Sequence, residues 1–167
     1  MTNEQEFRPE LTSRRGELMA WVSAVALGVA MFLAGRLWIS IPSFLWIFEG
    51  FLAFSALSIS LGNWMDRKSV IRLGAEGIAF ENGLRSVRLN WSEVQNVAVS
   101  ETRMGRRVQV IGPTSHFAFK MLNELNPNGQ VFRTGFAAGQ KILDTVVRSS
   151  GLQLKSTSDG LYYYSRT

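Results

Sequence analysis

The segment "LMAWVSAVALGVAMFLAG", residues 18–35, is a continuous run without a charged side chain. As an α-helix it would be roughly 27 Å long, close to the roughly 30 Å of a membrane hydrocarbon core. A second apolar run, residues 43–62, follows a short loop and is interrupted only by Glu49. The sequence therefore predicts transmembrane helices over about 18–37 and 43–62, which form a hairpin spanning residues 18–62.

Two other interpretations of these runs fit less well. A cleaved signal peptide is disfavoured because residues 1–17 carry four Glu and because a second apolar run follows. Two buried helices of a soluble protein would need a larger surrounding protein than the remaining residues, about 100, can supply.

Basic side chains are distributed unevenly around the hairpin. The loop between the two runs carries only Arg36, whereas five basic residues flank the open end of the hairpin: Arg14, Arg15, Arg67, Lys68 and Arg72. Because basic flanks stay on the cytoplasmic side, both termini are predicted to be cytoplasmic. We therefore expect a multi-pass protein of the cell inner (plasma) membrane, with residues 1–17 as a cytoplasmic N-terminal segment.

After residue 62 the hydrophobic pattern changes from helical to alternating. In "RSVRLNW", residues 85–91, Val87, Leu89 and Trp91 share one face, and glycines separate this run from its neighbours. Five to seven antiparallel strands are predicted between residues 69 and 122. This region begins a cytoplasmic domain, residues 63–155, and we expect residues 65–167 to fold without the hairpin.

The last predicted element of this domain is an amphipathic helix over residues 135–150. Thr134 is its expected N-cap and Gly151 its C-terminal stop. Phe136, Leu143, Val146 and Val147 share the apolar face, which would close the open end of a curved sheet. Residues 156–167 are expected to be a C-terminal tail, which could add an edge strand.

Two segments carry a likeness to a known family: "IRLGAEGIAFENG", residues 71–83, and "VRLNWSEVQNVAV", residues 87–99. Behind a two-helix hairpin, they resemble the bacterial pleckstrin-homology-like (PH-like, bPH) membrane proteins, in which a Trp-x-Glu-hydrophobic signature often links two strands. Here the signature is "WSEV", residues 91–94. The resemblance implies an α+β membrane protein with an antiparallel β-sandwich or barrel closed by a C-terminal helix. A photosystem I assembly factor with two membrane helices is a more distant likeness.

Few side chains suggest chemistry. The chain has no Cys and a single His, His116, which excludes disulfides and disfavours a typical zinc site. No glycine-rich segment has the Gly-Lys-Ser/Thr ending of a phosphate loop, and basic residues do not alternate with aromatic ones as in nucleic-acid-binding surfaces. We therefore expect no enzymatic activity, no cofactor, no metal and no nucleic-acid partner.

The turn "TRMGRR", residues 102–107, is the most distinctive charged feature. Arg103, Arg106 and Arg107 surround Met104 at a predicted hairpin turn. Near an anionic leaflet each basic residue would contribute about 1 kcal/mol, so these four residues are candidates for lipid binding. The alternative is a solvated turn whose charges prevent aggregation of sheet edges.

Glu49 is the other candidate site, because a carboxylate inside a membrane helix is costly unless it is neutral or paired. Arg36, at the outer end of the first helix, is its expected partner within the hairpin. The alternative is that Glu49 contacts a helix of another protein.

The sequence thus favours a non-enzymatic, membrane-anchored adaptor or assembly factor with a membrane or cytoplasmic protein as its partner. Two alternatives remain: a domain that senses anionic lipid, and an accessory subunit of a larger membrane complex.

Overall fold

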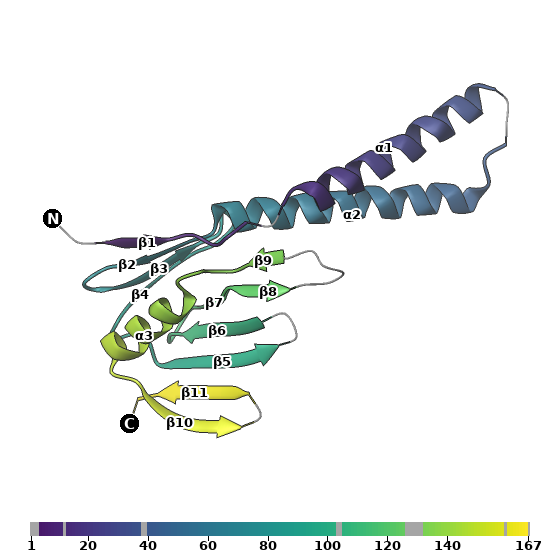
Figure 1. Ribbon diagram of the computed structural model, residues 1–167. Helices are drawn as coiled ribbons and strands as arrows, with labels where there is room; N and C mark the ends of the chain where they lie inside the picture. The colour runs from purple at the N-terminus through teal and green to yellow at the C-terminus, as the bar shows by residue number, and fades with distance from the viewer. Residues whose placement is uncertain are drawn as a thin grey trace. The chain divides into compact units, whose positions relative to one another are not determined.

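The computed structural model describes residues 4–11, 13–37, 40–102, 105–125, 132–158 and 160–166. The chain separates into two compact units. The helical hairpin is Ser13–Trp64, and the β-unit combines Met1–Thr12 with Met65–Thr167. The β-unit is therefore discontinuous in sequence, with the hairpin inserted near its beginning (Figure 1).

The hairpin consists of two long helices, α1 (Arg15–Arg36) and α2 (Ser43–Lys68). Both are long and apolar enough to cross a membrane. Of the most apolar 18-residue segment of each helix, only 11% in α1 and 6% in α2 is buried. They are therefore not core helices of the β-unit, and the predicted pair of apolar helices is confirmed. The second helix extends six residues beyond the predicted end because no Gly or Pro follows Gly62 before its last turn, where Arg67 and Lys68 complement the helix dipole.

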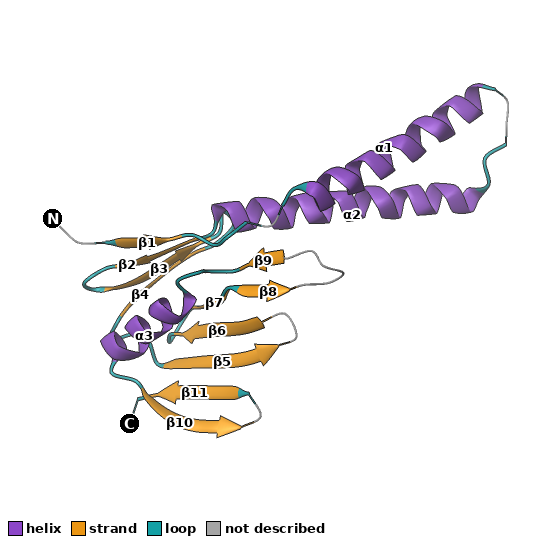
Figure 2. Ribbon diagram, viewed as in Figure 1, coloured by secondary structure: helices purple, strands orange, loops and turns teal. Residues whose placement is uncertain are grey.

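The strands of the β-unit form two main antiparallel sheets (Figure 2). The first has the order β1-β2-β3-β4, with bounds Gln5–Phe7, Val70–Leu73, Gly77–Glu81 and Ser86–Asn90. The second has the order β10-β11-β5-β6-β7, with bounds Gln153–Ser158, Leu161–Ser165, Asn96–Thr102, Gly105–Ile111 and His116–Lys120. A short ladder pairs β8 (Asn123–Leu125) with β9 (Phe132–Thr134). The α+β class is confirmed, whereas the barrel alternative is wrong because the described strands form separate sheets.

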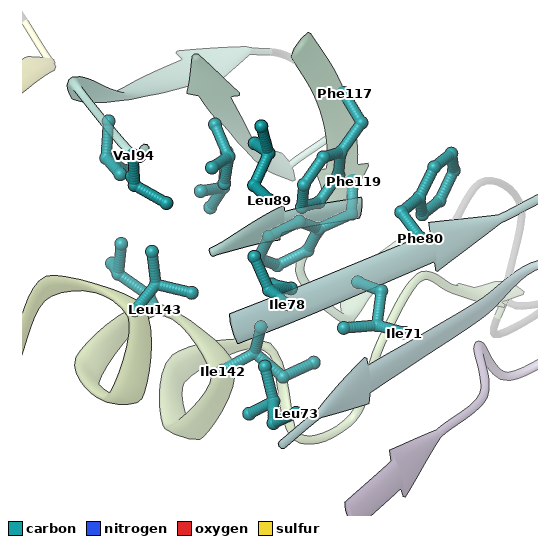
Figure 3. Close-up of a cluster of buried hydrophobic side chains, with 14 of the residues drawn as sticks. Ile71, Leu73, Ile78, Phe80, Leu89, Val94, Phe117, Phe119, Ile142 and Leu143 are labelled. Atoms are coloured by element: carbon teal, nitrogen blue, oxygen red, sulfur yellow. The ribbon is translucent and has the colours of Figure 1, made fainter. Parts of the chain in front are cut away.

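One hydrophobic core joins both sheets to the helix α3 (Gly139–Ser150). Val87 and Leu89 are buried in the predicted alternation, and Val94 is fully buried. Figure 3 shows Ile142 and Leu143 of α3 pointing toward the side chains of the sheets. The predicted amphipathic helix is therefore present and packs its apolar face into the core.

Two boundaries in the C-terminal part differ from those expected. The last helix begins at Gly139, whereas Thr134 ends strand β9. Gly135 between them has φ +105°, and a Cβ there would lie 2.5 Å from the carbonyl oxygen of Met121. Because Gly135 crosses closely over the backbone of Met121, the helix begins four residues later, at Gly139. This contact joins segments that are distant in sequence, so the local helix signals do not reveal it. Residues expected as a tail form β11 and the second half of β10, and β11 pairs with β5.

The N-terminal segment is a strand of the β-unit, which the sequence did not indicate. β1 pairs with β2 through Phe7 opposite Ile71, and Phe7 packs against the core. Glu6 accepts hydrogen bonds from Arg8 (2.8 Å) and Arg72 (3.3 Å), which lower the pKa of its carboxyl, with Arg8 as the larger cause. The backbone N–H of Glu10 donates to the Gly135 carbonyl (2.8 Å). Residues 65–167 alone therefore lack the edge strand of the first sheet.

We expect residues 4–11, joined by a Gly/Ser linker to residues 65–167, to be more stable than residues 65–167 alone. The difference should be about 2 kcal/mol, because the joined form buries the apolar part of Phe7. Urea unfolding of the two proteins measures it. The joined protein with Phe7→Ser is the matched control and should lose most of the gain; equal stability of all three would show that β1 does not stabilise the sheet.

Candidate functional site

A polar cluster joins α1 to α2 at the end of the hairpin where α1 begins and α2 ends. Trp21 Nε1 donates to Ser60 Oγ (2.8 Å), and Ser60 Oγ donates to Glu17 Oε1 (3.1 Å). Asn63 Nδ2 donates to Glu17 Oε2 (2.9 Å). This cluster was not predicted from the sequence, although Ser60 and Asn63 are three residues apart and so lie on one face of the second helix.

Small residues line the contact between α1 and α2 further along. Ala24 and Ala56 are 3% and 0% exposed, and Met31 is also buried. Gly28 lies against Glu49, because a Cβ at position 28 would be 3.1 Å from Glu49 Oε1. The carboxylate therefore faces the first helix, as the hypothesis of a role within the hairpin required.

The expected partner of Glu49 is not in place. Its Oε2 atom is buried and has no hydrogen-bond partner among the described residues. The Arg36 guanidinium instead lies 5.2 Å from the ring centroid of Phe32, on its own helix. Glu49 thus occupies the helix contact without the ion pair that the hypothesis proposed.

We expect Glu49→Gln and Arg36→Gln to act independently. Since the side chains do not pair, the double-mutant coupling should be below about 0.5 kcal/mol. The chain has no Cys, so dyes attached to Leu18→Cys and Leu61→Cys can report separation of the helices by energy transfer during SDS titration. A coupling energy above about 1 kcal/mol would support the hypothesis that Glu49 and Arg36 form an ion pair.

The residues of the basic turn, 102–107, differ in their surroundings. Arg103 and Met104 lie outside the described residues. Arg106 Nε is 2.9 Å from Glu101 Oε1, so this cation is paired. Arg107, next along β6, lies opposite Lys120 of β7 in the sheet register. Adjacent strand residues point to opposite faces, a signal in the sequence that could have separated Arg106 from Arg107.

Arg107 and Lys120 also line a cavity of about 310 Å3 that lies wholly within the β-unit. We call it the α2-end cavity because Met65 and Asp66, near the end of α2, form part of its wall. Three buried rings, Phe80, Phe119 and Phe136, supply apolar lining.

Four charged side chains surround the α2-end cavity, two of each sign: Glu10, Asp66, Arg107 and Lys120. All four are exposed, and none of them forms an ion pair with another residue in the part of the chain that the structure describes. Charges of both signs thus remain available to a ligand in the α2-end cavity.

The described ranges also bear on metal binding and on the single histidine. They contain no group of three or more His, Cys, Asp or Glu side chains that could hold a metal ion. His116 is exposed on β7.

The "WSEV" segment is a structural corner between β4 and β5. Trp91 Nε1 donates to the carbonyls of Gly74 (3.3 Å) and Ala75 (3.0 Å) in the β2–β3 turn. Glu93 Oε2 accepts from the Asn90 backbone N–H (2.8 Å), which holds the corner. These residues therefore hold the corner between β4 and β5.

Comparisons with protein-family models, with curated proteins and with solved structures each return no match for this chain.

Proposed function

We propose that this chain is a non-enzymatic, membrane-anchored adaptor or assembly factor whose β-unit presents a protein-binding surface in the cytoplasm. The observation that carries the proposal is the insertion of two exposed apolar helices into a β-unit. Because β1 pairs with β2, the chain leaves the β-unit for the hairpin and returns to it. Such an arrangement anchors a folded module without separating its parts.

A PH-like identity of the β-unit is part of this proposal. Its support is the order of elements: a four-stranded antiparallel meander, a second antiparallel sheet, and a helix that packs into the core. The additional hairpin β10-β11 extends the second sheet beside β5. The cytoplasmic placement is supported by the basic residues at the open end of the hairpin.

Reporter fusions test the placement in the membrane. Fusions at the N-terminus and at the C-terminus should both report the cytoplasm, and a fusion in the loop at residue 39 should report the opposite side. A C-terminal fusion that reports the outer side would overturn the proposal.

Affinity purification in mild detergent tests the adaptor role. The full chain should retain a protein partner in stoichiometric amount, and so should a variant in which residues 13–64 are replaced by an unrelated two-helix hairpin. Recovery of no partner with either protein would contradict the proposal.

One observation favours the accessory-subunit alternative, namely that Glu49 Oε2 is buried and has no hydrogen-bond partner among the described residues. A polar side chain of another membrane protein could satisfy this atom if α1 and α2 moved apart where Glu49 meets Gly28. In that case the partner would be lost with the replaced hairpin, and Glu49→Gln in the full chain would weaken its recovery.

A further inference from the structure

Met65 and Asp66 belong to α2, so the rise of this helix sets their own depth in a membrane. From Gly62, where the apolar run ends, to Asp66 the helix rises roughly 6 Å. The headgroup region of a bilayer is roughly 5–8 Å thick on each side of the hydrocarbon core. Trp64, near this boundary, is the kind of residue that concentrates at membrane interfaces. The wall formed by Met65 and Asp66 therefore lies at the depth of lipid headgroups if α2 spans the membrane as proposed.

The chemistry of the cavity matches a ligand that carries both signs of charge. Arg107 and Lys120 are opposite each other on neighbouring strands and suit a phosphate. Asp66 lies in the last turn of α2, where the helix dipole also favours a cation, and Glu10 adds a second carboxylate. A phosphate alone would meet repulsion from the two carboxylates, whereas a phosphate joined to an ammonium would satisfy all four charges.

We propose that the α2-end cavity binds the zwitterionic phosphoethanolamine headgroup of a membrane lipid. Arg107 and Lys120 hold the phosphate, and Asp66 and Glu10 accept hydrogen bonds from the primary ammonium. A cavity of about 310 Å3 is at the small end of ligand sites, as a headgroup requires. This inference rests on the proposed placement of the hairpin in the membrane and adds a lipid ligand to the proposed adaptor.

Native mass spectrometry of the full chain in detergent, with added lipids of identical acyl chains, tests this assignment. Phosphatidylethanolamine should bind at least about fivefold more tightly than phosphatidylcholine, whose methylated ammonium cannot donate hydrogen bonds, or than phosphatidylglycerol, which has no ammonium. Equal binding of the three lipids, or tighter binding of phosphatidylglycerol, would overturn the proposal.

Paired substitutions locate the site. Arg107→Gln with Lys120→Gln should weaken phosphatidylethanolamine binding about tenfold, and Asp66→Asn with Glu10→Gln should abolish the preference over phosphatidylglycerol. The matched control, Arg148→Gln with Lys155→Gln, removes two exposed cations outside the cavity lining and should change nothing. All of these side chains are exposed, so far-UV circular dichroism should show unchanged folds. An equal effect of the control pair, or no effect of the cavity pairs, would show non-specific binding and refute the site.

The failure of this site is separable from the failure of the proposed function. A chain that inserts into membranes and retains its protein partner, but shows no headgroup preference, would refute only the lipid site. A chain whose reporter fusions contradict membrane insertion would refute both.

Discussion

Gly77→Ala is expected to destabilise the β-unit by about 3 kcal/mol or more. A Cβ at position 77 would lie 2.2 Å from the carbonyl oxygen of Leu89 and 2.9 Å from the Cα of Asn90. Both atoms belong to the backbone of β4, which pairs with β3 at this position, so no side-chain movement relieves the overlap. Pulse proteolysis of the full chain in detergent, in increasing urea, measures the loss.

The chain supplies a matched control at the other end of the same turn. A Cβ at Gly74 would be 3.8 Å from its nearest neighbour, the carbonyl oxygen of Gly77, which is an ordinary contact. Gly74→Ala should therefore change the free energy of unfolding by less than about 1 kcal/mol. Similar losses for the two variants would mean that the contact with β4 is not the cause.

Trp91→Ala is expected to cost about 3 kcal/mol, the low end for removal of a large aromatic side chain from a core. The indole is only partly buried, but it packs against the core and donates hydrogen bonds to the carbonyls of the β2–β3 turn. The variant thus loses apolar contact and leaves Gly74 and Ala75 without this donor. The same proteolysis assay measures the change.

Trp91→Phe separates the two contributions. It keeps most of the ring contact and removes the donor, so it should cost about 1 kcal/mol. If Trp91→Ala cost less than about 1 kcal/mol, the indole would not stabilise the corner, and a role in binding a partner would become the better interpretation.

The parts of the fold that the sequence predicted are those with a local signal. The apolar runs of the two helices and the alternation of Val87 and Leu89 are properties of neighbouring residues, and both are present in the structure. The same holds for Gly151, whose φ of 65° ends the last helix as expected.

The parts that were not predicted depend on contacts between distant residues. "QEF", residues 5–7, is too short and polar to show alternation, and its partner strand begins at Val70. For Glu49, the sequence indicated the facing helix but not the neighbour. Gly28 and Arg36 lie roughly 12 Å apart along α1, and the level at which α2 packs against α1 decides between them. The α2-end cavity combines residues from the N-terminus, the end of α2 and β7, which no local pattern connects.

The position of the hairpin within the β-unit also sets an order for biosynthesis. Phe7 leaves the ribosome 64 positions before Ile71, its partner in the sheet. At about 5–20 residues per second this is a delay of roughly 3–13 s, during which both helices are synthesised. The first sheet therefore closes only after the hairpin has been made. If the hairpin spans a membrane as proposed, the N-terminal strand has to stay on the side where its partner strand emerges, because a chain whose N-terminus has crossed the membrane cannot complete the sheet.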